Sequence, residues 1–157
     1  TLGHTPARPP IVATMNPVAV VGVLVGLVAL ATVIGLVWRS QQGRIHHTRG
    51  TTTVKVGDVP GMRRFARGAT FLQFSTEVCA PCKVTRDVLG AVANEHSNVA
   101  HVDVDLTHRP DLASQFHIMQ TPTTLILDSK GVVRARIGGA PRRDAVRAEL
   151  DRILVAA

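Results

Sequence analysis

Two cysteines, Cys79 and Cys82, are the residues of this sequence best suited to chemistry, and they are its only cysteines. Their spacing allows a small disulfide ring to close and reopen. Apolar residues after the pair recur at helical spacing, so the first cysteine lies at a helix start, where unpaired N–H groups and the helix dipole favour an anion. Such a thiolate attacks a substrate disulfide, and the second cysteine then releases the reduced substrate. The pair therefore predicts thiol–disulfide exchange.

Other uses of two cysteines fit the sequence less well. A structural disulfide framework needs more cysteines at longer separations, and a zinc site needs two further ligands. The adjacent His46 and His47 lie in a polar segment far from the cysteines, so we expect them to be solvated and predict no metal. An inert buried pair remains as an alternative, although strand-to-helix turns are where thiolates are activated. Pro81, between the cysteines, is compatible with a first helical turn.

The elements expected around the cysteines form a small α/β domain over residues 52–157. The sequence predicts strands at 52–56, 70–75, 99–106, 123–128 and 132–137, and helices that begin at the cysteine motif, at residue 111 and at Pro141. Strand–helix units come early and a hairpin comes late. This order predicts a mixed sheet with helices on both faces.

A long apolar segment, residues 18–38, precedes this domain and contains no charged residue. A bilayer core of about 30 Å needs roughly 20 such residues in a helix, whereas the apolar region of a removable signal peptide has roughly 7 to 15. The segment therefore predicts a retained, single-pass transmembrane helix, with the lipid bilayer as a partner. We expect residues 1–17 to be disordered and residues 39–51 to form a basic linker.

Basic residues are unevenly distributed about the apolar segment. Only Arg8 precedes it, and a start at Met15 would leave none. The residues that follow it are Arg39, Arg44, Arg49, Lys55, Arg63, Arg64 and Arg67. The positive-inside rule then predicts a cytoplasmic domain, with an extracytoplasmic domain as the alternative. The net charge of +7 does not indicate nucleic acid, because the basic residues are scattered without interleaved aromatics.

Three segments resemble landmarks of the thioredoxin family and occur in the family's order. The segment from Phe74 to Lys83 is similar to the thioredoxin active-site segment. Residues 118–123 are similar to the loop that bears a cis-proline, and residues 138–140 to the glycine turn before the last helix. The resemblance covers residues 52–157 and implies a thioredoxin fold.

The resemblance also implies a role for individual residues. Cys79 would be the nucleophile and Cys82 the resolving cysteine, and their redox-active disulfide would serve without any bound cofactor. Pro122 would follow a cis bond and pack beside them. The backbone of Thr121 would then be free to pair with an extended substrate segment.

The sequence departs from the family at several positions near the cysteines. Gln73 stands where the family has a buried aspartate, and a glutamine cannot accept the proton of the resolving thiol. His101 stands at a nearby lysine position and is a candidate proton acceptor or charge modulator, or else a partly buried, hydrogen-bonded strand histidine. Glu77 is a further candidate base or a solvated loop carboxylate. Val78 and Ser75 replace aromatic residues.

These features predict an enzyme, a membrane-anchored thioredoxin-like oxidoreductase that reduces protein disulfides. Its partners would be protein disulfide substrates and an electron donor, either a reductase or a membrane thiol relay. The Ala-Pro dipeptide between the cysteines favours a reductant by family analogy. Two alternatives stay open: a redox-sensing or accessory subunit of a membrane complex with little turnover, and a structural interaction domain.

Overall fold

The computed structural model describes residues 16–41, 43–48 and 52–156. The chain divides into two compact units, Thr1–Ser40 and Gln41–Ala157. Residues 1–15, which make up most of the segment predicted to be disordered, lie outside the described part.

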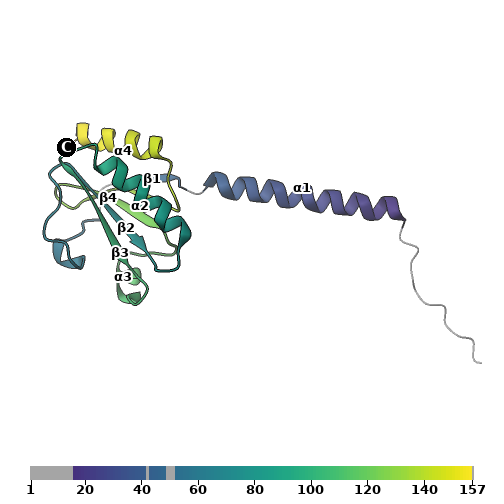
Figure 1. The fold of residues 1–157 in the computed structure, drawn as a ribbon, viewed down its shortest axis with the longest axis horizontal. Helices are drawn as coiled ribbons and strands as arrows, with labels where there is room; N and C mark the ends of the chain where they lie inside the picture. Colours follow the sequence, from purple (N-terminus) through teal and green to yellow (C-terminus); the bar gives the residue numbers. More distant parts are fainter. Residues whose placement is uncertain (1–15, 42, 49–51, 157) are drawn as a thin grey trace, which may run out of the picture. The chain divides into compact units, whose positions relative to one another are not determined.

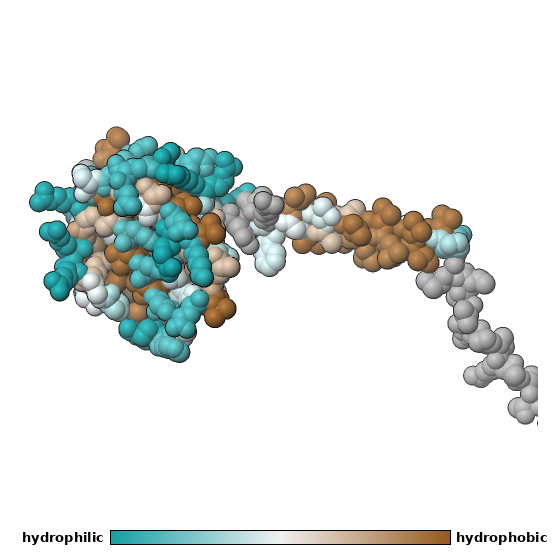
Figure 2. Space-filling view, in the orientation of Figure 1, coloured by the Kyte–Doolittle hydropathy of each residue, from teal (hydrophilic) through white to brown (hydrophobic). Residues whose placement is uncertain are grey.

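In the first unit, the described residues form one long helix, α1 (Pro17–Gln41) (Figure 1). At about 1.5 Å per residue, a helix of 25 residues is long enough to cross a bilayer core. The stretch Pro17–Trp38 has a mean hydropathy of 2.8, and none of its most apolar window is buried. Figure 2 shows apolar side chains along most of α1. By length and composition, α1 is therefore a candidate membrane span.

The second unit is built around one mixed sheet (Figure 1). Its described elements are β1 (Ile45–His47), η1 (Val56–Asp58), β2 (Ala69–Ser75), α2 (Ala80–Ala93), β3 (Val99–Asp105), α3 (Pro110–Gln115), β4 (Thr123–Asp128), β5 (Val133–Gly138) and α4 (Arg143–Ala156). The strand order is β1-β5-β4-β2-β3, with β2 and β3 parallel and the other pairs antiparallel. The predicted mixed sheet is confirmed.

Each face of the sheet carries its own apolar core. Alternate residues of β2 point to opposite faces, as the period of a strand requires. Phe71 packs with Leu89 of α2 and Leu150 of α4 on one face. Leu72 and Phe74 pack toward α3 and the chain before β2 on the other. The helices therefore cover both faces, as predicted, and all seven residues of β2 are buried.

A charged cluster joins the end of α2 to α4. Glu95 accepts hydrogen bonds from Arg147 at 2.7 and 2.8 Å and from Arg143 at 2.6 Å. These hydrogen bonds, from Arg147 and then Arg143, lower the pKa of Glu95 to about 2, so the carboxylate stays charged at any physiological pH. The cluster holds the carboxyl end of α2 against α4, and α2 is the helix that carries the cysteines.

The structure differs from the sequence prediction at the start of the second unit. Ile45–His47 lies inside the predicted linker, yet it forms β1 and pairs with β5, with Ile45 opposite Ile137. The predicted strand at 52–56 is represented by a single bridge between Thr53 and Val132. The side chain of Ile45 packs against the core under α2 and α4. A three-residue strand with one partly buried side chain is too short to produce a periodic pattern, so the sequence gives no signal of its long-range pairing.

Removal of β1 is expected to destabilise the second unit. A fragment of residues 52–157 lacks the backbone hydrogen bonds to β5 and leaves the site of Ile45 open. Full burial of an isoleucine contributes about 1.5–3 kcal/mol, of which the partly buried Ile45 contributes a part, and each hydrogen bond contributes about 1 kcal/mol. We therefore expect this fragment to unfold with a free energy about 3 kcal/mol below that of residues 41–157, as measured by urea denaturation. Ile45→Ala in the longer fragment should lose less, and equal stability of both fragments would contradict a structural role for β1.

Candidate active site

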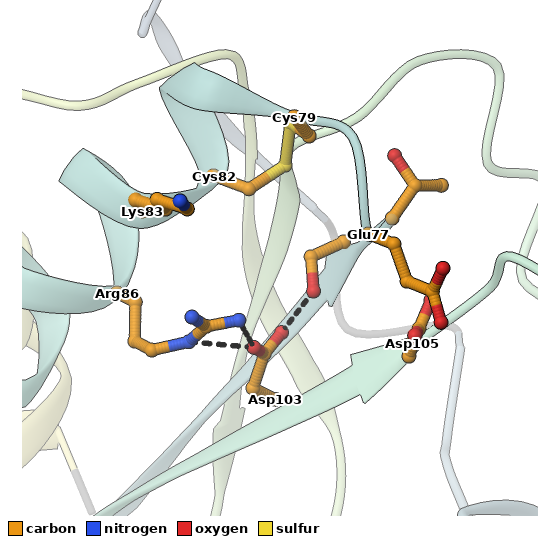
Figure 3. Close-up of a pocket in the computed structure, with 9 residues that line it drawn as sticks. Glu77, Cys79, Cys82, Lys83, Arg86, Asp103 and Asp105 are labelled. Atoms are coloured by element: carbon orange, nitrogen blue, oxygen red, sulfur yellow. Dashed lines mark hydrogen bonds and ion pairs between the residues drawn. A yellow bond between two sulfur atoms is a disulfide. The ribbon is translucent and has the colours of Figure 1, made fainter.

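The candidate active site forms where β2 ends and α2 begins. Cys79 is the N-cap residue of α2, with an extended backbone, and is half-buried. Cys82 lies one turn into the helix and is only 1% exposed. The two residues form a disulfide, with Cα atoms 5.3 Å apart (Figure 3). One sulfur is therefore accessible and the other is shielded, which is the asymmetry that attack followed by internal resolution needs.

The start of α2 favours a thiolate at Cys79. No side chain caps this end of the helix by a hydrogen bond. The first backbone N–H groups, which lack a helical acceptor, therefore face Cys79 without a capping side chain. Their partial positive charge stabilises an anion there. Pro81 occupies the first turn without loss, since it has no N–H, and its carbonyl accepts a hydrogen bond from Thr85 Oγ1 at 3.0 Å.

The loop before β4 lies beside the strand end that leads to the cysteines. The Thr121–Pro122 bond is cis, in agreement with the expectation drawn from the resemblance. Thr121 Oγ1 lies 3.4 Å from Thr76 Oγ1, which brings the loop next to the segment between β2 and Cys79. Pro122 is buried, and its carbonyl accepts a hydrogen bond from Gly139 N at 2.8 Å.

An open, polar pocket of about 320 Å³ lies against the disulfide (Figure 3). Asp103 of β3 and Arg86 of α2 point toward each other in it, and Asp103 accepts hydrogen bonds from Arg86 Nε at 2.8 Å and from Ser75 Oγ at 2.6 Å. Glu77 also lines this pocket, in the exposed loop before Cys79. Sequence reasoning singled out neither Asp103 nor Arg86.

Signals for these two residues do exist in the sequence. Arg86 follows Cys82 by four positions, which places both on one face of α2. Asp103 follows His101 by two positions, which places both on one face of β3. Arg86 and Asp103 come together only because this face of α2 packs on this face of β3, and neither spacing predicts that packing.

Gln73 and His101 lie deeper, behind Cys82. Gln73 is fully buried, and its Nε2 donates a hydrogen bond to the Cys82 carbonyl at 3.0 Å. His101 Nε2 lies 3.0 Å from Gln73 Oε1. Burial lowers the pKa of His101 below its usual value; Asp103 opposes this shift and Arg86 adds to it. The structure thus gives His101 the hydrogen-bonded strand position that the sequence allowed as one alternative.

Two exposed apolar side chains lie close in sequence to residues of the site. Val78, directly before Cys79, is 97% exposed, and Met119, in the loop that leads to Thr121, is 93% exposed. Exposed apolar side chains next to the first cysteine and in the cis-proline loop are suited to contact with an unfolded or extended polypeptide. The site can therefore present a nucleophilic sulfur, a shielded second sulfur and a surface for a protein chain.

Comparison with known proteins places this site in a family. The family model "Thioredoxin" matches residues 64–152, which is more than half of the chain. Thioredoxin C-2 of Corynebacterium nephridii is 38% identical over 65 residues, which span 41% of this chain and 60% of that protein. A thioredoxin of Chlamydia trachomatis is 37% identical over 73 residues, which span 45% of this chain and 70% of that protein.

A solved structure with the same fold is that of chloroplastic thioredoxin z. It superposes with a TM-score of 0.52 at 25% sequence identity, covering 58% of this chain and 81% of that one. The family match includes strands β2 to β5, the cysteine pair and the loop before β4.

Proposed function

Because the chain belongs to the thioredoxin family, we propose that it is a membrane-anchored thiol–disulfide oxidoreductase that reduces protein disulfides with Cys79 and Cys82. One observation carries this proposal. A half-buried cysteine at the start of α2 is joined to a buried cysteine one turn away. This arrangement supports reversible exchange, because one sulfur meets the substrate while the other waits behind it.

The reaction starts from the dithiol. The Cys79 thiolate attacks one sulfur of a substrate disulfide, forms a new S–S bond and expels the other substrate sulfur as a thiolate, which takes a proton from solvent. Cys82 then loses its proton and attacks the Cys79 sulfur. This step closes the Cys79–Cys82 disulfide and releases the second substrate thiol. Two electrons pass from the protein to the substrate, and an external dithiol must return them.

The surrounding residues would hold the substrate for this attack. We assign the backbone of Thr121 to pairing with an extended substrate segment, while Pro122 shapes the loop that presents it. The exposed Val78 and Met119 would contact apolar side chains of the substrate. Protein disulfides, in segments that can extend across this surface, are therefore the proposed substrate class.

Membrane anchoring is the second part of the proposal. α1 has the length and composition of a membrane span. The excess of basic residues after it favours a cytoplasmic position for the domain and attraction to anionic lipid headgroups. The electron donor would then be a soluble reductase, whereas a domain on the opposite side would need a membrane thiol relay.

Turnover of a protein disulfide tests the function. We expect the full chain in detergent micelles to accelerate the reduction of insulin disulfides by dithiothreitol. Cys79→Ser should return the rate to that of dithiothreitol alone, because it removes the half-buried cysteine and leaves Cys82, which is 1% exposed. The assay follows the turbidity of the released insulin chains. No acceleration by the unmodified chain would contradict a general reductase, and a single stoichiometric reaction would support a redox-sensing subunit.

A further inference from the structure

We propose that His101 is a positioning residue for the resolving cysteine, acting through the buried Gln73 amide. Together, the two side chains hold the first turn of α2 by a chain of hydrogen bonds that has no acid in it. This inference rests on the proposed exchange reaction and concerns its second step, the attack by Cys82.

One face of α2 packs on one face of β2 and β3, and this packing brings together the residues of the hydrogen-bond chain. Cys82, Arg86 and Gly90 follow at intervals of four along α2 and so share a face. The backbone carbonyl of Cys82 accepts a hydrogen bond from Gln73 Nε2, and Arg86 donates a hydrogen bond to Asp103. At Gly90, a Cβ atom would lie 4.0 Å from His101 Nδ1. His101 therefore lies directly beneath α2, two turns from the cysteine.

The direction of each hydrogen bond follows from its neighbour. The Cys82 carbonyl can only accept, so the Gln73 atom that faces it is the amide nitrogen. The amide oxygen of Gln73 then faces His101 and can also only accept. His101 must therefore carry a proton on Nε2 and donate it. The Cys82 carbonyl thus fixes the orientation of the Gln73 amide, and this amide fixes the tautomer of His101.

The chain persists across the physiological pH range. The charged groups that act on His101 are Asp103 on the same strand and Arg86 on α2. Burial lowers the pKa of His101, so the ring is neutral near neutral pH and keeps its proton on Nε2 for the hydrogen bond. Protonation at lower pH adds a proton at Nδ1 and leaves the Nε2 donor in place. In either state, His101 holds Gln73.

The hydrogen-bond chain of Cys82, Gln73 and His101 contains no carboxylic acid that could take up a proton during the resolving step. Gln73 cannot take the proton that Cys82 loses, and His101 Nε2 already carries one. The proton of Cys82 therefore leaves through the open pocket beside the disulfide, to solvent, to substrate or to the carboxylates of Glu77 and Asp103 that line this pocket. Gln73 and His101 should then add no inflection of their own to the pH profile of the resolving step.

The two steps can be separated with the full chain in detergent micelles and an aromatic disulfide, dithiobis(nitrobenzoate). Attack by the Cys79 thiolate releases one thionitrobenzoate and leaves the other bound to Cys79. Attack by the Cys82 thiolate on Cys79 then releases the second thionitrobenzoate and closes the protein disulfide. Stopped-flow absorbance resolves the two releases, and the second reports the resolving step over a range of pH.

His101→Leu removes the Nε2 donor and puts an apolar side chain of similar bulk in its place. We expect the second release to slow about five- to tenfold, the kinetic equivalent of one lost hydrogen bond, while the first release is unchanged. His101→Gln, whose amide can donate to Gln73, should recover most of the rate. His108→Leu, at an exposed position, is the matched control and should leave both releases unchanged.

Gln73→Glu keeps the shape of the side chain and adds an acid behind Cys82. The unmodified chain should show one inflection in the pH profile of the second release, and Gln73→Glu should show two. Equal second-release rates in His101→Leu and His101→Gln, with normal thermal unfolding, would overturn the positioning role, as would a second inflection in the unmodified chain that disappears in His101→Leu. A chain without any first release would instead refute the proposed function, so the two failures are distinguishable.

Discussion

Cys82→Ser is expected to leave the protein covalently bound to its substrate. Cys79 is the accessible sulfur and still attacks a disulfide, but the buried position that should release the product then carries a hydroxyl. The mixed disulfide therefore accumulates until an external thiol cleaves it. With oxidised insulin or a membrane extract as substrate, we expect adducts on non-reducing gels that disappear on reduction. Turnover should fall by at least about a hundredfold, because an intramolecular step has become bimolecular.

The matched variant is Cys79→Ser, which keeps the buried sulfur and removes the accessible one. Its adducts should be near background, because Cys82 is 1% exposed. Equal trapping by both variants would show that either cysteine can attack, and would remove the distinction between nucleophile and resolving residue. Mass spectrometry of the trapped species identifies the substrates directly.

Phe71→Ala is expected to cause the largest loss of stability among single core substitutions near the site. Phe71 is fully buried on β2, an interior strand between β4 and β3, and packs in the core under α2 and α4. Removal of a buried phenylalanine side chain costs about 3–5 kcal/mol, the sum of lost transfer free energy and a residual cavity. That is a large part of the total stability of a small domain. The free energy of unfolding from urea titration measures it.

A second phenylalanine provides the control. Phe65 packs at the margin of the core on the other face and is half-buried, so Phe65→Ala should cost less than half as much. Phe71 also lies on the same face of β2 as Gln73, two residues earlier. We therefore expect Phe71→Ala to weaken the packing of α2 on β2 and to slow thiol–disulfide exchange, whereas Phe65→Ala should do neither. A similar loss from both substitutions would contradict the central position of Phe71.

Most of the second unit was predictable from the sequence because its signals are local. The apolar run from Thr70 to Ser75, the helical spacing after Cys82 and the hairpin signal near Gly131 each depend on residues that are close in the chain. The structure places elements within a residue or two of those predictions. The cysteine pair was equally clear, because both the chemistry and its strand-to-helix context lie within a few residues.

Only the tertiary structure decided how the distant parts meet. Strand β1 joins the sheet by pairing with β5, where Ile45 lies opposite Ile137. A three-residue strand carries no periodic signal of its own, so the sequence did not predict this pairing. Gln73 and His101 meet because the parallel register of β2 and β3 sets Phe71 opposite His101, which makes Gln73 its diagonal neighbour on the same face. A shift of one residue in that register would turn His101 to the other face. Spacing along the chain therefore determined the reactive cysteines, while the register between strands determined the residues behind them.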